Sequence, residues 1–335
     1  MFSLPIQSEV AEMLKTQSQF KAGRLSKYLP EWHKITSDPT ILQYVRGVRI
    51  EFKGNQPPPA NEGSCVTQQP LNISVVRAEI QKLLAKGVIV KSQHEPGEFI
   101  SPIFLLPKKD GTSRMILNLK RFNQYVAYHH FKMGTLDTVI KLMKPGCYMA
   151  SIDLRDAYYT VAIHPDHQKY LKFVVNGVLY QYTCLPNGLA SAPRIFTKLM
   201  KPVYSTLRSM GQIISGYIDD SYLQGDSVAA CSSNVKASAT LLNTVGLFLH
   251  PDKSVLSPAQ TVTFLGFVLN SLNMTVSPTP EKISKTIKCC SKLLQTLQPT
   301  MLQVSRVVGI LISNLPGVEF GQLHYRSREI DKIRP

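Results

Sequence analysis

Apolar residues recur at regular spacings along most of the chain, and these spacings predict its first elements. Within residues 72–86, valine, isoleucine and leucine recur every three or four positions, and Gly87 follows them. This period predicts an amphipathic helix that ends at the glycine. Apolar runs at 101–106 and 114–119 flank a Lys-Asp-Gly turn at 109–111, a pattern typical of a β-hairpin.

Helices and hairpins alternate irregularly in the rest of the chain. Asn176-Gly177 is a strong two-residue hairpin signal, while Ser191 and Pro193 favour the start of a helix that runs to about residue 210. The other expected strands cover 148–153, 160–163, 171–175, 178–182, 213–218, 221–223, 263–269 and 274–276, and the other expected helices cover 227–245, 281–297 and 301–313. Hairpins without regular βαβ alternation favour an α+β fold, an antiparallel sheet with helices on one face.

A proline-rich stretch divides the chain near residue 60. Residues 54–59 read Gly-Asn-Gln-Pro-Pro-Pro, and consecutive prolines cannot join a helix or a central strand. Short helical patterns precede this stretch, among them residues 40–46. We therefore expect residues 1–60 to form an N-terminal extension that ends in a proline-rich linker.

The net charge of the chain is strongly positive, which indicates the kind of molecule that it binds. The 335 residues carry 38 lysines and arginines against 22 aspartates and glutamates, a formal net charge of +16. Such an excess indicates a polyanionic partner, either a nucleic acid or an anionic membrane surface. No apolar run reaches the roughly 18 residues of a membrane span, and the first residues lack the pattern of a signal peptide. We therefore expect a nucleic acid as partner, no membrane, and an intracellular place in the cytoplasm or nucleus.

The six cysteines agree with that compartment. None forms a C-x-x-C pair, and the one close pair, Cys289-Cys290, is adjacent in sequence. Neither a zinc site nor a disulfide framework is therefore expected. Reduced thiols are typical of intracellular proteins.

Two acidic patches stand at the ends of apolar strands. Asp153 closes the strand predicted over 148–153, and Asp219-Asp220 follows the strand predicted over 213–218. A buried carboxylate is costly unless a cation accompanies it, and hard divalent metals such as Mg²⁺ bind carboxylate oxygens. Two such metals about 3.5–4 Å apart stabilise the attacking and leaving oxygens of a phosphoryl displacement. A solvated hairpin turn would give the same Asp-Asp pair, so the pattern by itself leaves both interpretations open.

Basic side chains gather at two places. Residues 101–125 contain one acidic residue and five basic ones: Lys108, Lys109, Arg114, Lys120 and Arg121. The helix predicted over 281–297 carries lysines along one face: Lys282, Lys285, Lys288 and Lys292. Lysines that face phosphates make binding depend on salt, with a log–log slope of about −0.9 per contact on a duplex. A solvated surface would show the same two patterns, so a binding role for each stays a hypothesis.

Five short motifs resemble those of reverse transcriptases and follow that family's order. Tyr217-Ile218-Asp219-Asp220 resembles its Y-x-D-D box, and Asp153 with Tyr158 resembles its first catalytic motif. The other three are the LP-x-G-x-x-x-x-P motif at 185–193, His250-Pro251-Asp252-Lys253 and Phe264-Leu265-Gly266-Phe267. Through residues 154–159 and 192–198, the chain resembles most the DIRS-type retrotransposons, which integrate with a tyrosine recombinase. Gypsy-type LTR elements are the second choice.

The resemblance implies a fold and an activity. The fold would be a right-hand polymerase of the α+β class, with fingers and palm over 61–277, and a thumb with the start of the connection region over 278–335. The chain would be an RNA-directed DNA polymerase, a nucleotidyltransferase that adds deoxynucleotides to a primer 3′-OH on an RNA or DNA template. The family normally carries an RNase H domain downstream, which we expect outside these 335 residues. A catalytically silent, nucleic-acid-binding relic of such an element is the alternative.

The resemblance also implies roles for single residues. Asp153 and Asp219 would hold two Mg²⁺ ions, with Mn²⁺ as a substitute, and Asp220 would complete the acidic cluster. Lys253 matches a lysine near the leaving pyrophosphate and would act as a general acid. Backbone N–H groups of residues 154–157 would contact the triphosphate. The residues expected to bind the nucleotide are Lys108, Arg114, Asp156, Ala157, Tyr158, Asn187 and Gly188, and those expected to bind nucleic acid are Lys282, Lys285, Lys288 and Lys292.

Within the nucleotide-binding set, the expected tasks differ. Lys108 and Arg114 would clamp the β- and γ-phosphates. Tyr158 would lie under the sugar and exclude a ribose 2′-OH, and Gly188 would let the template or nucleotide approach the backbone closely. Asn187 departs from the Phe or Gln that the family usually has at this position. This departure puts fidelity or activity in question, and leaves the metal site unaffected.

Overall fold

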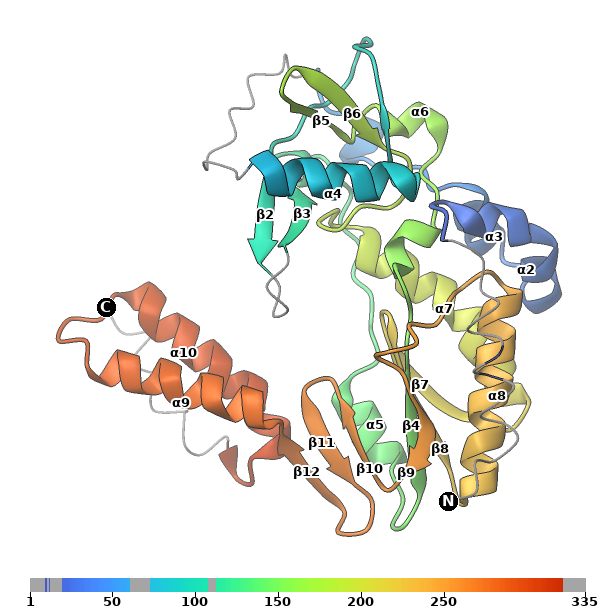
Figure 1. The fold of residues 1–335 in the computed structure, drawn as a ribbon, viewed down its shortest axis with the longest axis vertical. Helices are drawn as coiled ribbons and strands as arrows, with labels where there is room; N and C mark the ends of the chain where they lie inside the picture. Colours follow the sequence, from blue (N-terminus) through green and yellow to red (C-terminus); the bar gives the residue numbers. More distant parts are fainter. Residues whose placement is uncertain (1–9, 11, 13–19, 61–72, 108–112, 322–335) are drawn as a thin grey trace.

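The structure, a computed structural model, describes residues 10, 12, 20–60, 73–107 and 113–321. Three parts are visible in Figure 1: small sheets with α4 (Ile73–Ala85) at the top, a four-stranded sheet with two long helices below, and an arm made of α9 (Pro280–Leu294) and α10 (Met301–Asn314). All pairs of named strands in the described residues run antiparallel. The predicted α+β class is confirmed.

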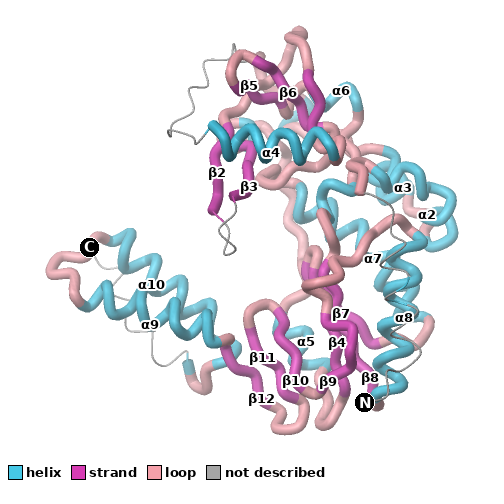
Figure 2. The backbone as a smooth tube through the Cα atoms, viewed as in Figure 1, coloured by secondary structure: helices cyan, strands magenta, loops and turns pink. Residues whose placement is uncertain are grey.

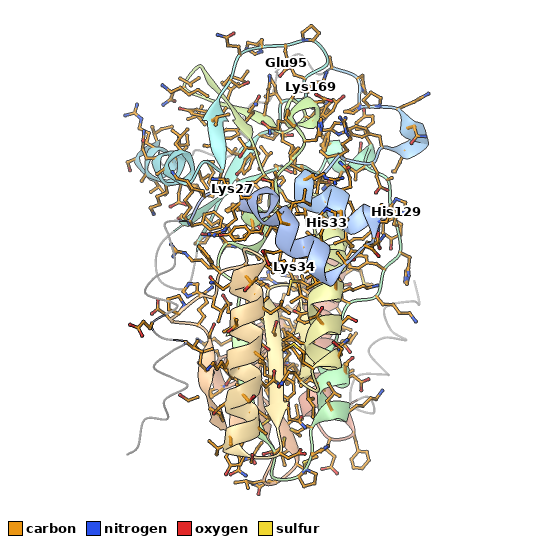
Figure 3. All side chains as sticks on the ribbon, turned by 90° about the vertical axis from the view of Figure 1, so that its right-hand side faces the viewer. Lys27, His33, Lys34, Glu95, His129 and Lys169 are labelled. Carbon is orange, nitrogen blue, oxygen red and sulfur yellow. The ribbon has the colours of Figure 1, made fainter. Side chains whose placement is uncertain are left out.

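The lower part is an antiparallel sheet in which the strands lie in the order β7-β8-β4-β9. Its strands are β4 (Tyr148–Asp153), β7 (Ile213–Tyr217), β8 (Asp220–Gly225) and β9 (Val255–Ala259). Helices α7 (Ala192–Ser209) and α8 (Val228–Thr244) lie side by side against one face of this sheet (Figure 3). This arrangement matches the sheet with helices on one face that the sequence predicts for the palm.

The other face of this sheet is covered by smaller elements. Successive side chains of a strand point to opposite faces, so Met149 and Tyr222 point away from the two long helices. They pack with the short helix α5 (Leu136–Leu142) and with residues of the next sheet in a second hydrophobic cluster. Both faces of the sheet are therefore buried, which fixes the positions of its strand ends.

Helix α7 follows its sequence pattern closely. Its buried side chains recur at helical spacing and include Ile195, Leu199, Val203 and Leu207. Pro193 lies in the first turn, where the missing N–H has no partner to lose. The predicted cap is wrong, however: Ser191 precedes the helix, but its backbone is already helical and its side chain accepts no capping bond. An N-cap serine needs an extended backbone to reach the free N–H groups.

The upper part contains two small antiparallel sheets. The strands are β1 (Ile89–Lys91), β2 (Ile103–Pro107), β3 (Ser113–Leu117), β5 (Lys172–Val175) and β6 (Val178–Tyr182), and α6 (Pro165–Gln168) lies beside them. The pairs β2–β3 and β5–β6 confirm the two predicted hairpins. Asn176 and Gly177 turn with φ of 50° and 75°, as an Asn-Gly turn requires. The turn at 109–111 lies outside the described residues.

A third sheet joins the palm to the helical arm. It contains β10 (Thr261–Phe264), β11 (Phe267–Asn270) and β12 (Thr275–Pro278). The prediction of one strand over 263–269 is wrong, because Leu265 and Gly266 adopt φ of 49° and 78° and turn the chain back. The two predicted helices after this sheet are confirmed as α9 and α10.

The described part of the N-terminal extension packs on the palm. It forms η1 (Arg24–Tyr28), α2 (Leu29–Ile35) and α3 (Pro39–Arg46). The indole N–H of Trp32 donates to the carbonyl of Val245 over 2.9 Å, and both residues belong to the large hydrophobic core. The division of the chain at residues 60 and 277 stays a prediction.

The strand predicted over 160–163 is not formed. The 3₁₀ turn η4 (Ala157–Thr160) occupies its start, and Ala162 and Ile163 make only isolated bridges. Other short 3₁₀ turns are η2 (Lys53–Asn55), η3 (Phe122–Gln124) and η5 (Leu315–Gly317). In the described part of the chain, no helix combines the length and the apolar character that crossing a membrane requires.

Candidate active site

The two predicted acidic patches meet at one end of the palm sheet. Asp153 is the last residue of β4 and Asp220 is the first of β8, and the two are direct partners in the antiparallel register. Asp219 stands in the two-residue turn between β7 and β8, where its carbonyl accepts a 2.9 Å hydrogen bond from the N–H of Leu154. The fold therefore brings Asp153 next to the Asp219-Asp220 pair, which is distant from it in sequence.

The turn that carries Asp219 is tightly built. Ile218 has a φ of 54°, a left-handed conformation that is unfavourable for a β-branched residue. Just before the turn, Gly216 has no space for a side chain, because a Cβ would lie 2.0 Å from the hydroxyl of Tyr204. That hydroxyl lies 2.9 Å from the hydroxyl of Ser221. Packing on both sides of the turn holds the strained conformation and fixes the position of Asp219.

Burial and mutual repulsion perturb the carboxylates. Desolvation, followed by the charges of Asp219 and Asp153, raises the pKa of Asp220 to about 6. Desolvation also raises the pKa of Asp153, an effect that Lys253 opposes and Asp219 reinforces. The ammonium of Lys253 lies 3.9 Å from the carboxylate of Asp153. Carboxylates in such surroundings are stabilised by a bound cation.

The chemistry of these side chains fits Mg²⁺. Carboxylate oxygens are the hard ligands that this ion prefers. Among the residues that the structure describes, no three histidine, cysteine, aspartate or glutamate side chains converge closely enough to enclose a metal by themselves. Mg²⁺ usually keeps several waters and binds through one or two carboxylates plus substrate phosphates. Carboxylates that leave space for a phosphate beside them therefore fit this ion better than a closed cage would.

A cavity of about 500 Å³ provides that space beside Asp219. The predicted site residues in its wall are Arg114, Asp156, Ala157, Tyr158, Asn187, Asp219 and Lys253. Asp153 and Asp220 adjoin this wall through the sheet, whereas Gly188 lies outside it. Lys108 lies outside the described residues. The volume falls within the range of pockets that hold small-molecule ligands.

The turn after β4 offers fewer free backbone donors than the sequence suggests. The N–H groups of Leu154 and Arg155 donate to the carbonyls of Asp219 and Phe248, at 2.9 and 2.8 Å. Two of the four expected triphosphate donors are therefore already used. The next residue, Asp156, has a φ of 50° and leads into η4, so only the second half of the turn remains for this task.

The aromatic residue expected under the sugar lines the cavity. Tyr158 packs edge-on against Phe196, with ring centroids 5.6 Å apart. Burial raises the pKa of Tyr158 to about 12, so its hydroxyl stays protonated at neutral pH. The amide of Asn187 donates to the hydroxyl of Tyr159 over 3.1 Å, so the side chain that departs from the family pattern is anchored. Gly188 has a φ of 99°, where other residues would be strained.

Three basic residues of the cavity wall escaped the sequence prediction: Lys86, Arg155 and His250. His250 begins one of the recognised motifs, which could have identified it. Its backbone N–H donates to the carbonyl of Asp153 over 2.7 Å and braces the end of β4. Lys86 directly follows α4 and belongs to no motif, so only the tertiary fold brings it to the cavity.

The four lysines expected to bind nucleic acid lie on α9, and none of them lines this cavity. Lys285, Lys288 and Lys292 are exposed. Lys282 differs, because its ammonium lies 3.7 Å from the ring centre of Phe267 and donates to the carbonyl of Ser313 over 2.7 Å. Lys282 is therefore held between the α9–α10 arm and its neighbouring sheet, and a nucleic-acid role for the other three stays a prediction.

Known proteins resemble this chain in sequence. Residues 106–269 match the family model described as reverse transcriptase (RNA-dependent DNA polymerase). The transposon Tf2-3 polyprotein of Schizosaccharomyces pombe is 21% identical over 285 residues, which cover 83% of this chain and 21% of that polyprotein. The Gag-Pro-Pol polyprotein of squirrel monkey retrovirus is 28% identical over 220 residues, 61% of this chain and 11% of that polyprotein. The chain thus spans about a fifth or less of the length of these relatives.

Solved structures resemble the fold. A foamy viral protease-reverse transcriptase (dRH) in complex with double-stranded DNA has a TM-score of 0.61 at 22% identity, covering 92% of this chain and 52% of that chain. A foamy viral protease-reverse transcriptase in complex with an RNA/DNA hybrid has a TM-score of 0.57 at 21% identity, covering 93% and 40%. The predicted polymerase fold is thereby confirmed. Residues 106–269 thus resemble the reverse transcriptase domain of retrotransposon and retroviral polyproteins.

Proposed function

We propose that the chain is an RNA-directed DNA polymerase that adds deoxynucleotides to a primer 3′-OH on an RNA or DNA template. The observation that carries this proposal is the meeting of Asp153, Asp219 and Asp220 at one sheet end, beside a cavity with basic residues on its other walls. Carboxylates opposite cations suit a triphosphate bound with metal ions. The reaction class is nucleotidyl transfer.

Asp153 and Asp219 would hold the metal ions, and Asp220 would complete the cluster. Mg²⁺, or Mn²⁺ in its place, supplies Lewis-acid stabilisation of the charge that develops on the attacking and leaving oxygens. The task of the chain is to hold the carboxylates in position. The register of β4 against β8 and the tight β7–β8 turn support this task. The raised pKa values of Asp153 and Asp220 express a repulsion that a divalent cation relieves.

The other walls of the cavity would bind the nucleotide. Arg114, from β3, would present its guanidinium to the β- and γ-phosphates, a geometry that suits this side chain. Lys253, close to Asp153, would give a proton to the leaving pyrophosphate. Tyr158 would lie under the sugar with its phenol protonated, so that a ribose 2′-OH meets its ring. Asn187 would hold its place beside the nucleotide through its bond to Tyr159.

The thumb would hold the template and primer. Figure 2 shows the helical pair α9 and α10 and the hairpin β2–β3 on the same side of the palm. We place the duplex on this side, against Lys285, Lys288 and Lys292. The foamy viral relatives are complexes with double-stranded DNA and with an RNA/DNA hybrid, which supports both kinds of duplex as partners.

The finer classification is part of the proposal. A DIRS-type retrotransposon is the source that the motifs at 154–159 and 192–198 favour, with gypsy-type elements second. One observation favours a second candidate function, a silent nucleic-acid-binding relic: Asn187 stands where the family usually has Phe or Gln. The intact set of Asp153, Asp219 and Asp220 favours the active enzyme.

Primer extension tests the proposal. The assay contains purified protein, a poly(rA) template, an oligo(dT) primer, dTTP and Mg²⁺. We expect extension that stops on chelation of the metal, while a gel shift still shows binding of the template–primer. Binding without extension in the unmutated protein would contradict the polymerase and favour the relic.

A further inference from the structure

A lysine from the upper part reaches the turn after β4. Lys86 directly follows α4, and its ammonium lies 2.6 Å from a carboxylate oxygen of Asp156. Both side chains are largely covered, with 34% and 21% of their surfaces exposed. Both residues also line the cavity beside Asp219. One ion pair thus links the fingers helix to the palm turn inside the candidate nucleotide pocket.

Asp156 places a negative charge in a wall that is otherwise suited to a triphosphate. Arg114, Arg155 and Lys253 line the same cavity, so phosphate groups would lie close to this carboxylate. Like charges repel strongly where burial reduces screening. The second cation near Asp156 is Arg155, and its Nε is more distant, at 3.9 Å. The close contact with Lys86 is therefore the main compensation of this charge among the described residues.

The backbone explains why an aspartate is tolerated here. Asp156 has a φ of 50° and a ψ of 37°, the left-handed region. Asparagine and aspartate tolerate this conformation better than other residues with a Cβ. The turn does not require the negative charge of Asp156, because asparagine tolerates the same left-handed conformation. The conformation and the charge of Asp156 can thus be separated by experiment.

The N-terminal segment holds Lys86 in place. The N–H of Ala22 donates to the carbonyl of Lys86 over 2.9 Å, and the N–H of Gly23 donates to the carbonyl of Tyr159 over 2.8 Å. One short segment therefore ties the end of α4 to η4. The ammonium of Lys86 also lies 5.7 Å from the ring centre of Phe20, a cation–π distance. Preorganisation of this kind keeps the ammonium beside Asp156.

We propose that Lys86 is a positioning residue for the nucleotide: it neutralises Asp156 and holds the turn after β4 so that this wall accepts a triphosphate. The proposal rests on the proposed polymerase function and extends it to a residue outside every recognised motif. Lys86 acts through Asp156, and the reacting groups themselves are held by other residues. Removing the ammonium leaves the carboxylate of Asp156 with only the more distant Arg155 near it, facing the triphosphate.

A double-mutant cycle tests this role. Lys86→Met should raise the KM for dNTP by roughly tenfold, with kcat and template–primer affinity changed by less than about twofold. Adding Asp156→Asn to Lys86→Met should recover most of that loss, because no carboxylate is then left unpaired. Lys86→Arg should retain a KM close to that of the unmutated protein. Lys82→Met is the matched control, since Lys82 lies one turn earlier on α4, is exposed and pairs with Glu79.

Two outcomes would overturn the proposal. The first is a KM that Lys86→Met leaves unchanged. The second is a double variant that stays as impaired as Lys86→Met, which would show that Lys86 does not act through Asp156. A structural role alone would lower thermal stability and kcat together, and Asp156→Asn would not restore the KM.

A second readout separates this proposal from the polymerase proposal. With a dideoxy-terminated primer, dNTP should stabilise the protein–template–primer complex against a heparin challenge, and Lys86→Met should weaken this effect. Nucleotide binding without extension by the unmutated protein would contradict the polymerase alone. Absence of any nucleotide-dependent complex in the unmutated protein would overturn both.

Discussion

Replacing Asp220 with asparagine should stabilise the protein when no divalent metal is present, although it damages the candidate active site. Asp220 lies partly buried beside Asp153 and Asp219, and desolvation is the largest cause of its raised pKa. Its negative charge therefore destabilises the folded state at neutral pH. Asparagine keeps the shape of the side chain and removes that charge.

The size of the effect follows from the pKa. The pKa of Asp220 rises from 3.8 to about 6. Each pKa unit is worth about 1.4 kcal/mol, so the full destabilisation at neutral pH would be about 3 kcal/mol. Solvent reaches part of this carboxylate, so we reduce the expectation to about 1–2 kcal/mol. For a chain of 335 residues, that corresponds to a rise of roughly 1–3 °C in Tm.

The pH dependence has a definite sign. The folded state binds the proton of Asp220 more tightly than the unfolded state does. The destabilisation is therefore complete above pH 6, decreases as the pH falls towards 4, and is absent below the pKa of the unfolded state. The difference in Tm between Asp220→Asn and the unmutated protein should follow the same course, largest at pH 7 and smallest near pH 4.

Thermal unfolding in EDTA, monitored by circular dichroism between pH 4 and 8, measures this difference. Millimolar Mg²⁺ should raise the Tm of the unmutated protein more than that of the variant, because binding to the folded state stabilises it. Asp226→Asn is the control, since Asp226 is an exposed carboxylate that lies 3.5 Å from Lys144. A Tm that Asp220→Asn lowers at pH 7 in EDTA would refute the reasoning, as would a difference that does not shrink below pH 6.

The remaining predictions concern substrate and duplex. Tyr158→Val should reduce the preference for dNTP over rNTP by about 10- to 100-fold, because a 2′-OH then avoids overpacking against the ring. Incorporation kinetics with both nucleotides measure this preference, and an unchanged value would remove Tyr158 from the sugar site. Arg114→Ala should raise the KM for dNTP while duplex affinity stays constant; the reverse pattern would make the β2–β3 hairpin a duplex contact. Changing Lys285, Lys288 and Lys292 to glutamine should make the slope of log affinity against log salt concentration shallower by about 0.9 per lysine. An unchanged slope would mean that this helix face contacts solvent and not the duplex.

Local signals account for the elements that the sequence predicted correctly. Asn176-Gly177 sets the β5–β6 turn by its own backbone preference, and the period of apolar residues in α7 fixes its buried face. Strands β1 and β9 were missed, because their partners β6 and β4 lie far away in the chain. Short strands with weak patterns depend on such partners for their existence. The strand expected over 263–269 failed for a different reason: an unrecognised turn at Leu265-Gly266 divides it.

In the candidate site too, some features follow from local sequence and others depend on contacts between distant segments. The motifs identified Asp153 and Asp219-Asp220 as the acidic cluster, and the register of β4 with β8 brings them together. The motifs could not identify Lys86, because its approach to Asp156 depends on how α4 packs against the palm. Nor could they show that the N–H groups of Leu154 and Arg155 are already bonded. Residues of one motif can be predicted from local sequence, whereas convergence of distant segments requires the fold.

Single-turnover primer extension by the unmutated protein and by Asp219→Asn tests the central claim most directly. Asparagine keeps the shape of the side chain but removes a hard anionic ligand. Loss of metal stabilisation at the developing charge should cost several kcal/mol, so extension should fall by at least about a thousandfold. Template–primer affinity should stay within about twofold, and Asp226→Asn should extend normally. Robust extension that survives Asp219→Asn would contradict the account, because the chemistry would then lie elsewhere in the molecule.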